Sequence, residues 1–391
     1  MAVDAEPVDL SFSLAKGGPL YSLLRRLRVV PAGGLAIKKR IILAWAFTIA
    51  PILLLALAAG QLGISGGGAE PLIRHFDVWT RLLVAIPLLI ADDALADFFV
   101  ARVGPQLRNT GLLAGADLPR FQRIAGFGER LRDSRLAFAI ALAIAVAAAV
   151  SRVAPFPPWR ELSWAVTDDA GISLAGYWYA FAGYGLFMLL ALQWLWRLVV
   201  LALVYRMIAR LDLELVPTHP DGAGGLEFLQ FTAFAFAPAA FALVAVISAR
   251  WAYEMVYRGL HLDALTGSII VLVVIVTAAL LVPLLMFTPS LVRLKGINRL
   301  RYSVLMARSG VAVDRKWVRG DASVTDAPNA PELGPLIDIL SLYRAVSAIR
   351  PLPLNFREFT ILIVVVSLPL LPVLLLEVPF KEIFARVLRA L

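Results

Sequence analysis

The chain has no cysteine and only three histidines. The absence of cysteine excludes disulfides, iron–sulfur clusters, cysteine-ligated zinc sites and thiol nucleophiles. His75, His219 and His261 all lie outside the long apolar runs, so a haem held by two histidines inside a membrane is not expected either. From these absences we expect no cofactor and no metal centre.

Charged residues are also scarce. They make up 17% of the 391 residues, whereas soluble proteins have about 25%. Apolar residues make up 60% of the chain, and the mean hydropathy is +0.80. A soluble fold of this size cannot bury so much apolar surface, so the composition predicts an all-α polytopic membrane protein. The net charge of +9 is then explained by basic loops on the cytoplasmic side, and nucleic acid is not an expected partner.

Seven runs are long and apolar enough to be read as membrane spans, which need about 20 residues. They are Ile41–Gly60, Val78–Val100, Leu136–Ala154, Tyr177–Tyr205, Leu229–Ser248, Ile269–Thr288 and Phe359–Leu376. The second run is the weakest, because its uninterrupted apolar part is only Leu82–Ile90. Pro369 and Pro372 leave two alternatives for the last run, which either crosses the membrane or folds back as a re-entrant hairpin.

Lysine and arginine are concentrated in alternate loops. Eleven lie between residues 290 and 358, whereas Gln61–Trp79 and Pro155–Gly176 each hold one. By the positive-inside rule this bias predicts a cytoplasmic N-terminus. The residue usage, rich in alanine, leucine and arginine and poor in lysine, is typical of a high-GC bacterium. We therefore expect a multi-pass protein of the bacterial inner membrane.

Four regions follow from the spans. Residues 1–40 form a cytoplasmic segment with a basic amphipathic helix at Pro19–Val30, which we expect to contact anionic lipids of the inner leaflet. Residues 41–288 form six spans. Residues 289–358 form a small helical cytoplasmic cap with a linker, built from helices at Ser290–Arg308 and about Pro335–Arg350. Residues 359–391 hold the last span and an amphipathic tail.

The second span carries three acidic residues, Asp92, Asp93 and Asp97. Asp93 and Asp97 are four residues apart and share one helix face, whereas Asp92 is turned about 100° away. A carboxylate deep in a bilayer is costly and would mark an ion or proton path or the partner of a basic group. Alternatively the helix ends early and leaves the aspartates at the inner interface.

Arg197 lies within the fourth span, between Trp194 and the end of the run. A guanidinium at this depth should face protein, and an aspartate of the second span is its expected partner. The alternative is that the side chain extends to the inner headgroups beside interfacial tryptophans.

The loop between the fourth and fifth spans contains His219-Pro220-Asp221-Gly222 followed by Gly224 and Gly225. Three interpretations stay open for it. The N–H groups near the glycines could hold an anion at the start of the next helix, His219 and Asp221 could hold a cation, or the segment is a rigid turn. Further along, Arg315, Lys316 and Trp317 are the residue types that contact lipid headgroups.

Together, the Pro217-Thr218-His219-Pro220-Asp221 and Gly224-Gly225-Leu226 loop and the later Asp314-Arg315-Lys316-Trp317 segment resemble a family of polytopic bacterial inner-membrane proteins. The resemblance covers Leu211 to the C-terminus. The family carries no settled activity, so the resemblance implies a bacterial plasma membrane and little else.

Three functions are compatible with these features. The leading hypothesis is a channel or transporter for ions, protons or small charged solutes, acting as a homo-oligomer in the lipid bilayer, because charged residues lie in the second and fourth spans. The first alternative is a non-catalytic scaffold, sensor or assembly partner built around the basic cap. The second is an enzyme acting on a lipid-linked or phosphorylated substrate at the cytoplasmic face, although the sequence shows no catalytic constellation.

Overall fold

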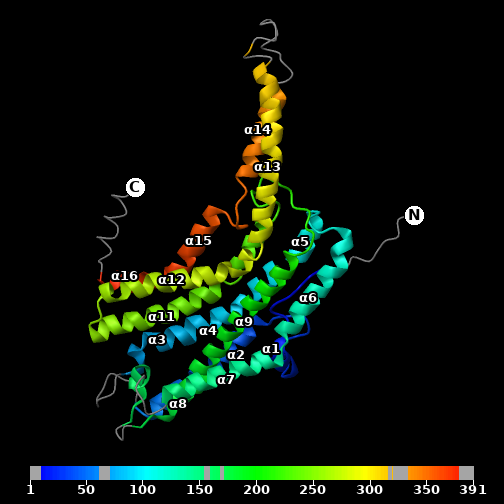
Figure 1. The fold of residues 1–391 in the computed structure, drawn as a ribbon. Coiled ribbons are helices and arrows are strands. Elements are labelled where there is room, and N and C mark those ends of the chain that lie inside the picture. Colours follow the sequence, from blue (N-terminus) through cyan, green and yellow to red (C-terminus); the bar gives the residue numbers. More distant parts are fainter. Residues whose placement is uncertain are drawn as a thin grey trace.

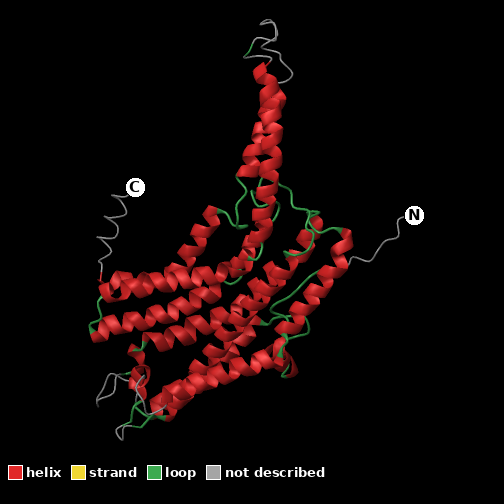
Figure 2. Cartoon of the chain, viewed as in Figure 1, coloured by secondary structure: helices red, strands yellow, loops and turns green. Residues whose placement is uncertain are grey.

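The computed structural model describes residues 10–60, 71–153, 159–167, 171–315, 319 and 333–377. Over these residues the chain is a set of packed helices joined by loops (Figure 2), and the β structure found there is one isolated bridge between Val166 and Ile172. The predicted all-α fold is confirmed.

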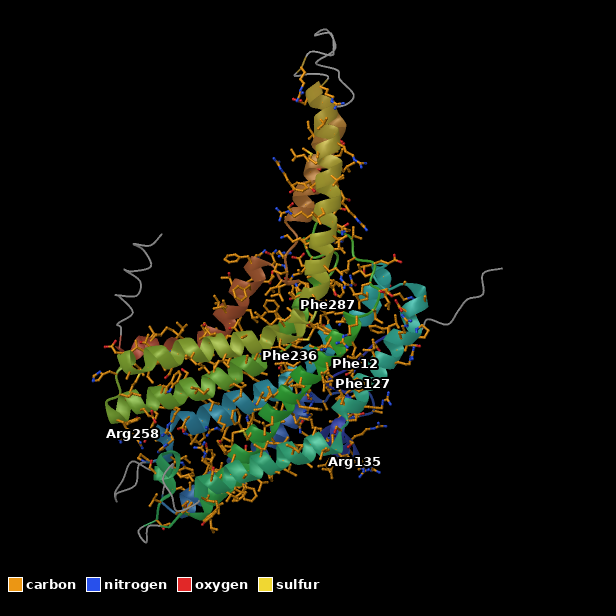
Figure 3. All side chains as sticks on the ribbon, viewed as in Figure 1. Phe12, Phe127, Arg135, Phe236, Arg258 and Phe287 are labelled. Carbon is orange, nitrogen blue, oxygen red and sulfur yellow. The ribbon has the colours of Figure 1, made fainter. Side chains whose placement is uncertain are left out.

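Within the described chain, six helical stretches are long and apolar enough to cross a membrane: Ile37–Ala58, Gly115–Val153, Leu174–Ile208, Glu227–Arg258, Leu262–Leu285 and Phe356–Leu376. They contain six of the seven predicted spans, so the chain is a multi-pass integral membrane protein. Arg135 and Arg258 lie at opposite ends of the bundle (Figure 3). A helical hairpin projects from the end that carries Arg135. We call this end of the bundle the hairpin end, and the end that carries Arg258 the opposite end.

Five long helices form most of the bundle: α2 (Ile37–Ala58), α7 (Arg135–Val153), α9 (Gly185–Ile208), α11 (Ala237–Arg258) and α12 (Leu262–Leu285). α9 and α11 are preceded by shorter helical segments of the same stretch. α8 (Leu174–Trp178) and the π-helical segment η5 (Tyr179–Tyr184) come before α9, and α10 (Gln230–Phe234) comes before α11.

The second predicted span is a central helix made of α3 (Phe76–Trp79), the π-helical segment η2 (Thr80–Ala85) and α4 (Ile86–Val100). It packs between α2, α9 and α11. Its exposed side chains are apolar, including Leu83, Leu95 and Phe98, and its acidic side chains Asp92 and Asp93 are buried. This is the reverse of a soluble amphipathic helix, and it is the arrangement that a lipid environment favours.

The fifth span is broken inside the bundle. α10 ends at Phe234, and α11 starts again at Ala237 after a turn capped by Phe236. Phe236 lies between the two ends of the bundle (Figure 3). Pro238 lies in the first turn of α11, where a missing N–H costs nothing, so the sequence favours a helix start there. The break places the N-terminus of a 22-residue helix inside the protein.

The last span crosses the bundle. α15 (Phe356–Ser367) is followed by a 3₁₀ turn at Leu368–Leu370, which contains Pro369, and then by α16 (Leu371–Glu377). Val373 packs against Ala252 and Leu265, which lie towards the opposite end of the bundle. Of the two alternatives, the geometry is that of a crossing helix with a proline kink. The tail from residue 378 onward lies outside the described residues.

The two helices predicted at Ser290–Arg308 and about Pro335–Arg350 are present and form a hairpin. α13 (Thr288–Val313) and α14 (Leu333–Ser347) pair with each other and project away from the bundle (Figure 1). Phe287, which is fully buried, fixes the root of the hairpin, and Ser290 donates a hydrogen bond to the Ala209 carbonyl there. The two helices pack against each other, but large apolar side chains of both stay exposed, among them Leu300 (70%) on α13 and Ile337 (66%) on α14.

Three surface helices lie at the hairpin end: α1 (Gly18–Arg26), α5 (Val103–Asn109) and α6 (Leu118–Arg132). The predicted basic helix at Pro19–Val30 is present as α1 but ends at Arg26. α6 approaches the bundle closely at Gly128, where a Cβ atom would lie 2.6 Å from Val204 and 2.8 Å from Phe12. The absence of a side chain at this position therefore lets α6 pack against α9 and the N-terminal segment.

We expect Gly128→Ala to destabilise the protein by about 1–3 kcal/mol, because the added methyl group overpacks this contact. Gly126→Ala in the same helix is the matched control, since its new methyl group would meet nothing within 4 Å. The control should keep or raise the stability by up to about 1 kcal/mol through helix propensity. Thermal melts in detergent measure both variants, and equal midpoints would contradict the close packing.

Candidate functional site

The centre of the candidate site is Asp93 on α4, which is held by arginines from two other helices. Nη1 of Arg40 on α2 lies 2.5 Å from Asp93 Oδ2, and Nη1 of Arg197 on α9 contacts Asp93 Oδ1. We call these three residues the Asp93 clamp. Its side chains are 3% (Asp93), 8% (Arg40) and 11% (Arg197) exposed. The structure thus places Arg197 against a second-span aspartate, the partner expected for it.

Asp92 lies beside the clamp but outside it. Its side chain is fully buried, and no side chain of the described residues donates a hydrogen bond to its carboxyl oxygens. The Arg197 guanidinium, the Asp93 carboxylate and the backbone N–H of Ala239 are its electrostatic neighbours. Ala239 is in the first turn of α11, so the broken fifth span turns the positive end of a long helix towards this carboxyl group.

Asp97 is in a different environment. Its carboxylate accepts a hydrogen bond of 2.7 Å from the Ser13 hydroxyl and lies 2.7 Å from Lys16 Nζ. The Lys16 side chain is 38% exposed, which places this ion pair at the surface of the hairpin end. Asp92 and Asp93 are therefore inside the protein and Asp97 is near its surface, and the helix does not end early but continues to Val100.

A second buried polar cluster occupies the other end of the central helix. Asp77 Oδ2 lies 3.7 Å from Arg250 on α11, and Asp77 Oδ1 lies 3.8 Å from His75 Nδ1. One turn along the helix, Arg81 donates a hydrogen bond to the Tyr179 hydroxyl of η5. The residues Asp77, His75, Arg250, Arg81 and Tyr179, which we call the far cluster, were missed by sequence reasoning. The available signal was the i,i+4 spacing of Asp77 and Arg81.

An apolar layer separates the two clusters. Leu82, Ala85, Ile86 and Leu89 of the central helix are all at most 1% exposed, and we call them the septum. Two indoles flank it, since Trp45 donates a hydrogen bond to the Leu82 carbonyl and Trp194 to the Leu89 carbonyl. The facing π-helical segments η2 and η5 contact each other here. Such segments are frequent at functional sites because they loosen the helical hydrogen-bond ladder.

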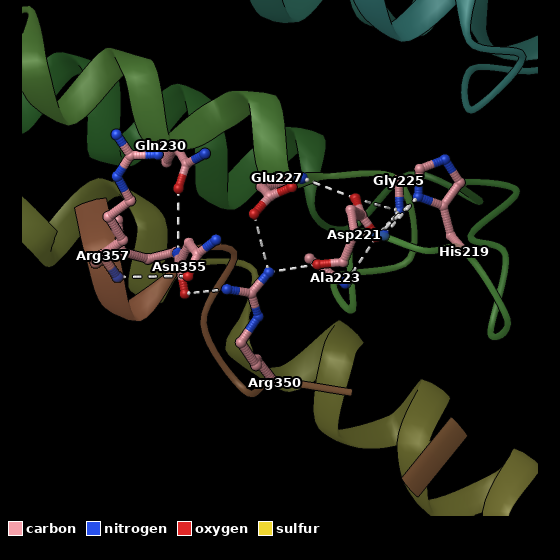
Figure 4. A network of polar contacts seen from close by, with 10 residues as sticks. His219, Asp221, Ala223, Gly225, Glu227, Gln230, Arg350, Asn355 and Arg357 are labelled. Atoms are coloured by element: carbon pink, nitrogen blue, oxygen red, sulfur yellow. Dashed lines mark hydrogen bonds and ion pairs between the residues drawn. The ribbon is translucent and has the colours of Figure 1, made fainter. Parts of the chain in front are cut away.

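The loop with His219 proves to be closed on itself (Figure 4). The Asp221 carboxylate accepts hydrogen bonds from the backbone N–H groups of Ala223, Gly225 and Glu227 at 2.8 to 3.1 Å, and His219 Nδ1 lies 2.9 Å from it. Gly224 and Gly225 have φ values of 66° and 98°, which glycine adopts without strain. The Asp221 carboxylate thus already binds the N–H group of Gly225, whereas the anion hypothesis requires this group to bind a ligand.

The cation hypothesis for the same loop also lacks support. Among the described residues, no group of three histidine, aspartate or glutamate side chains is placed to hold a metal ion. Of the three interpretations, the geometry fits the rigid turn. Its role is mechanical, because Arg350 binds the Asp221 carbonyl and lies 3.1 Å from Glu227 Oε1, which ties the segment after α14 to the start of the fifth span (Figure 4).

The predicted headgroup contacts are Arg315, Lys316 and Trp317. Arg315 is exposed and lies two residues after the last residue of α13, the helix that projects away from the bundle (Figure 1). Its contact with lipid headgroups stays a prediction. Lys316 and Trp317 lie outside the described residues.

No family model, curated protein or solved structure matches the chain. The resemblance to a family of inner-membrane proteins therefore stays a prediction, and the function has to be argued from the geometry.

We expect Asp93→Asn to be strongly destabilising, by about 3–5 kcal/mol, because it leaves two buried guanidinium groups without their shared counter-ion. Asp97→Asn should cost at most about 1 kcal/mol, because its ion pair is at the surface. Thermal melts of the two variants in the same detergent compare them directly. Equal losses for both would show that the clamp does not hold the helices together.

The loop gives a pH prediction. Partial burial raises the pKa of Asp221. Hydrogen bonds from the backbone N–H groups of Ala223, Glu227 and Gly225 and from the His219 side chain lower this pKa by more, so it lies below its usual value. The folded-state pKa is depressed, so the stabilisation is present at neutral pH and is lost as the pH falls below about 4. Asp221→Asn should lower the melting midpoint at pH 7, and its difference from the wild type should narrow in acid. Asp338→Asn, which removes an exposed carboxylate on α14, is the control. If the difference in melting midpoint between Asp221→Asn and the wild type were the same at all pH values, this account would be contradicted.

Proposed function

We propose that this protein transports protons, alone or coupled to a small charged solute, and that Asp92 is the group that binds and releases them. One observation carries the proposal. Asp92 is fully buried and no side chain of the described residues donates a hydrogen bond to it, while both nearby arginines are bound to Asp93.

Both charge states of Asp92 are accessible in this setting. Burying a carboxylate without a direct partner is costly, which favours the neutral acid. The Arg197 guanidinium and the N-terminus of α11 act in the opposite direction and stabilise the charge after a proton leaves. A group in such a balance can exchange a proton, whereas the Asp93 carboxylate is held between two guanidinium groups.

The septum favours a transporter over an open channel. Asp92 and Arg81 are eleven residues apart on the central helix, which corresponds to about 16 Å along its axis at 1.5 Å per residue. The buried apolar side chains between them separate the two polar clusters. In our proposal the π-helical segments η2 and η5 rearrange during transport, so that Asp92 is reached from one end at a time.

The membrane and the orientation belong to the same proposal. We infer that the hairpin end faces the cytoplasm of a bacterium, because it carries the basic N-terminal segment, α6 and the basic helix α13. Protons then reach Asp92 from the cytoplasm past the Asp93 clamp and from the other side through the far cluster.

The test is proton flux in proteoliposomes with an entrapped pH-sensitive dye and a membrane potential set by a potassium gradient and valinomycin. Wild-type protein should carry protons faster than empty vesicles, and Asp92→Asn should reduce this flux at least about tenfold, as is typical for the loss of a group that transfers protons. Asp97→Asn, the same substitution on the same helix, should keep most of the flux.

Thermal stability is measured in parallel. Asp92→Asn should melt close to the wild type, because it replaces a neutral buried acid with a neutral amide of the same size. A flux unchanged by Asp92→Asn, or a wild type no faster than empty vesicles, would refute the proposal.

A further inference from the structure

A basic cavity opens at the hairpin end between α1, the end of α6 and the start of α7. Its volume is about 1140 Å³, and five of its lining residues are cationic: Lys16, Arg25, Arg26, Arg132 and Arg135. One acidic residue, Asp133, lines it as well. This cavity is separate from the Asp93 clamp, and the proton-transport proposal does not use it.

The positive charge of the cavity is only partly compensated. The Asp133 carboxylate is bound by Arg132, whose Nε lies 2.8 Å from Oδ1 and whose Nη2 lies 2.9 Å from Oδ2. It also accepts a hydrogen bond from the Gly18 backbone N–H. Lys16 is paired with Asp97.

The other three cations, Arg25, Arg26 and Arg135, have no ion-pair partner within the described chain. Three guanidinium groups around one cavity form a site for an oxyanion, and guanidinium binds phosphate, like carboxylate, through paired hydrogen bonds.

The surroundings favour a lipid as the source of the phosphate. α7 begins its span at Arg135, so the cavity lies at the level where the bundle enters the membrane. Leu23 and Leu27, on and next to α1, are 50% and 64% exposed. Arginine beside exposed leucine on a surface helix is the pattern that binds a headgroup and its acyl chain together.

A narrow slot leads from this cavity towards the bundle interior. It is lined by Arg132, Gln193, Trp196 and Arg197, and its volume is about 30 Å³. That is room for a water molecule and not for a headgroup, so a bound phosphate stays in the outer cavity. The Gln193 amide nitrogen is buried without a hydrogen-bond partner in the described chain and is suited to bind such a water.

We propose that the cavity between α1, α6 and α7 binds a phosphate group, and that the phosphate is the headgroup of an anionic phospholipid. Arg25, Arg26 and Arg135 contact the phosphate oxygens, and Leu23 and Leu27 contact the acyl chains.

The experiment measures lipid binding to the full chain in detergent by native mass spectrometry, with phosphatidylglycerol as the probe. Arg26→Gln together with Arg135→Gln should weaken binding about 25-fold, since each basic residue near a membrane surface contributes about fivefold. The control Arg301→Gln with Arg308→Gln removes the same charge from exposed positions on α13 and should leave binding unchanged. The charge-keeping pair Arg26→Lys with Arg135→Lys should bind within a few fold of the wild type.

The second arm of the experiment uses inorganic phosphate, both as a competitor of phosphatidylglycerol and as a ligand on its own. If phosphatidylglycerol binds with this residue dependence and millimolar phosphate does not displace it, the site takes a lipid headgroup. If phosphate alone binds with the same residue dependence and phosphatidylglycerol does not, the lipid assignment is overturned. If Arg26→Gln with Arg135→Gln binds phosphatidylglycerol as the wild type does, the site itself is overturned. None of these readouts depends on proton flux.

Discussion

The structure depends on a single buried carboxylate shared by two guanidinium groups. Asp93 joins α2, α4 and α9 through Arg40 and Arg197, at a depth where an unpaired charge of either sign would cost several kcal/mol. The three helices must therefore approach one another in one register. The clamp also uses up both arginines, which leaves the neighbouring Asp92 to be stabilised only by a helix terminus and by the field of Arg197.

The rest of the bundle follows from this arrangement. The central helix carries its charges on the buried face and its apolar residues towards lipid, so it is stable only when surrounded by α2, α9 and α11. Its charges form two groups at different depths with the septum between them. An apolar barrier flanked by polar groups on both sides is the minimum that a proton carrier needs, because it prevents free leakage while leaving a site that can change its charge.

Much of this layout could be predicted from the sequence. Six of the seven spans follow from hydropathy. The burial of Asp93 and its pairing with Arg197 were one of two alternatives that the cost of charge in a bilayer left open. Asp92 and Asp93 are turned about 100° from each other around the helix axis. This explains why Asp93 faces α2 and α9, whereas Asp92 faces α11. Arg40 could not be assigned, because it reads as one more basic residue before the first span, and its role depends on the tertiary contact with Asp93.

Other features escaped prediction for similar reasons. The far cluster joins Asp77 to Arg250 on α11 and Arg81 to Tyr179 on η5, and no local pattern links residues so far apart in sequence. The π-helical segments η2 and η5 differ from α-helix by single hydrogen-bond shifts that hydropathy does not record. The Asp221 loop looked like a ligand site because its donors were visible in the sequence, whereas the fact that Asp221 satisfies them itself is a property of the folded turn.

The central claim is that Asp92 is the group that exchanges protons, whereas Asp93 holds the helices together through Arg40 and Arg197. Infrared difference spectroscopy tests it directly, because the carbonyl stretch of a protonated carboxylic acid is separate from the carboxylate bands. When the protein is reconstituted in lipid and taken from high to low pH, the wild type should gain one buried carboxylic-acid band that Asp92→Asn lacks and Asp97→Asn retains. The same band in Asp92→Asn would contradict the account, because the proton would then reside on another group.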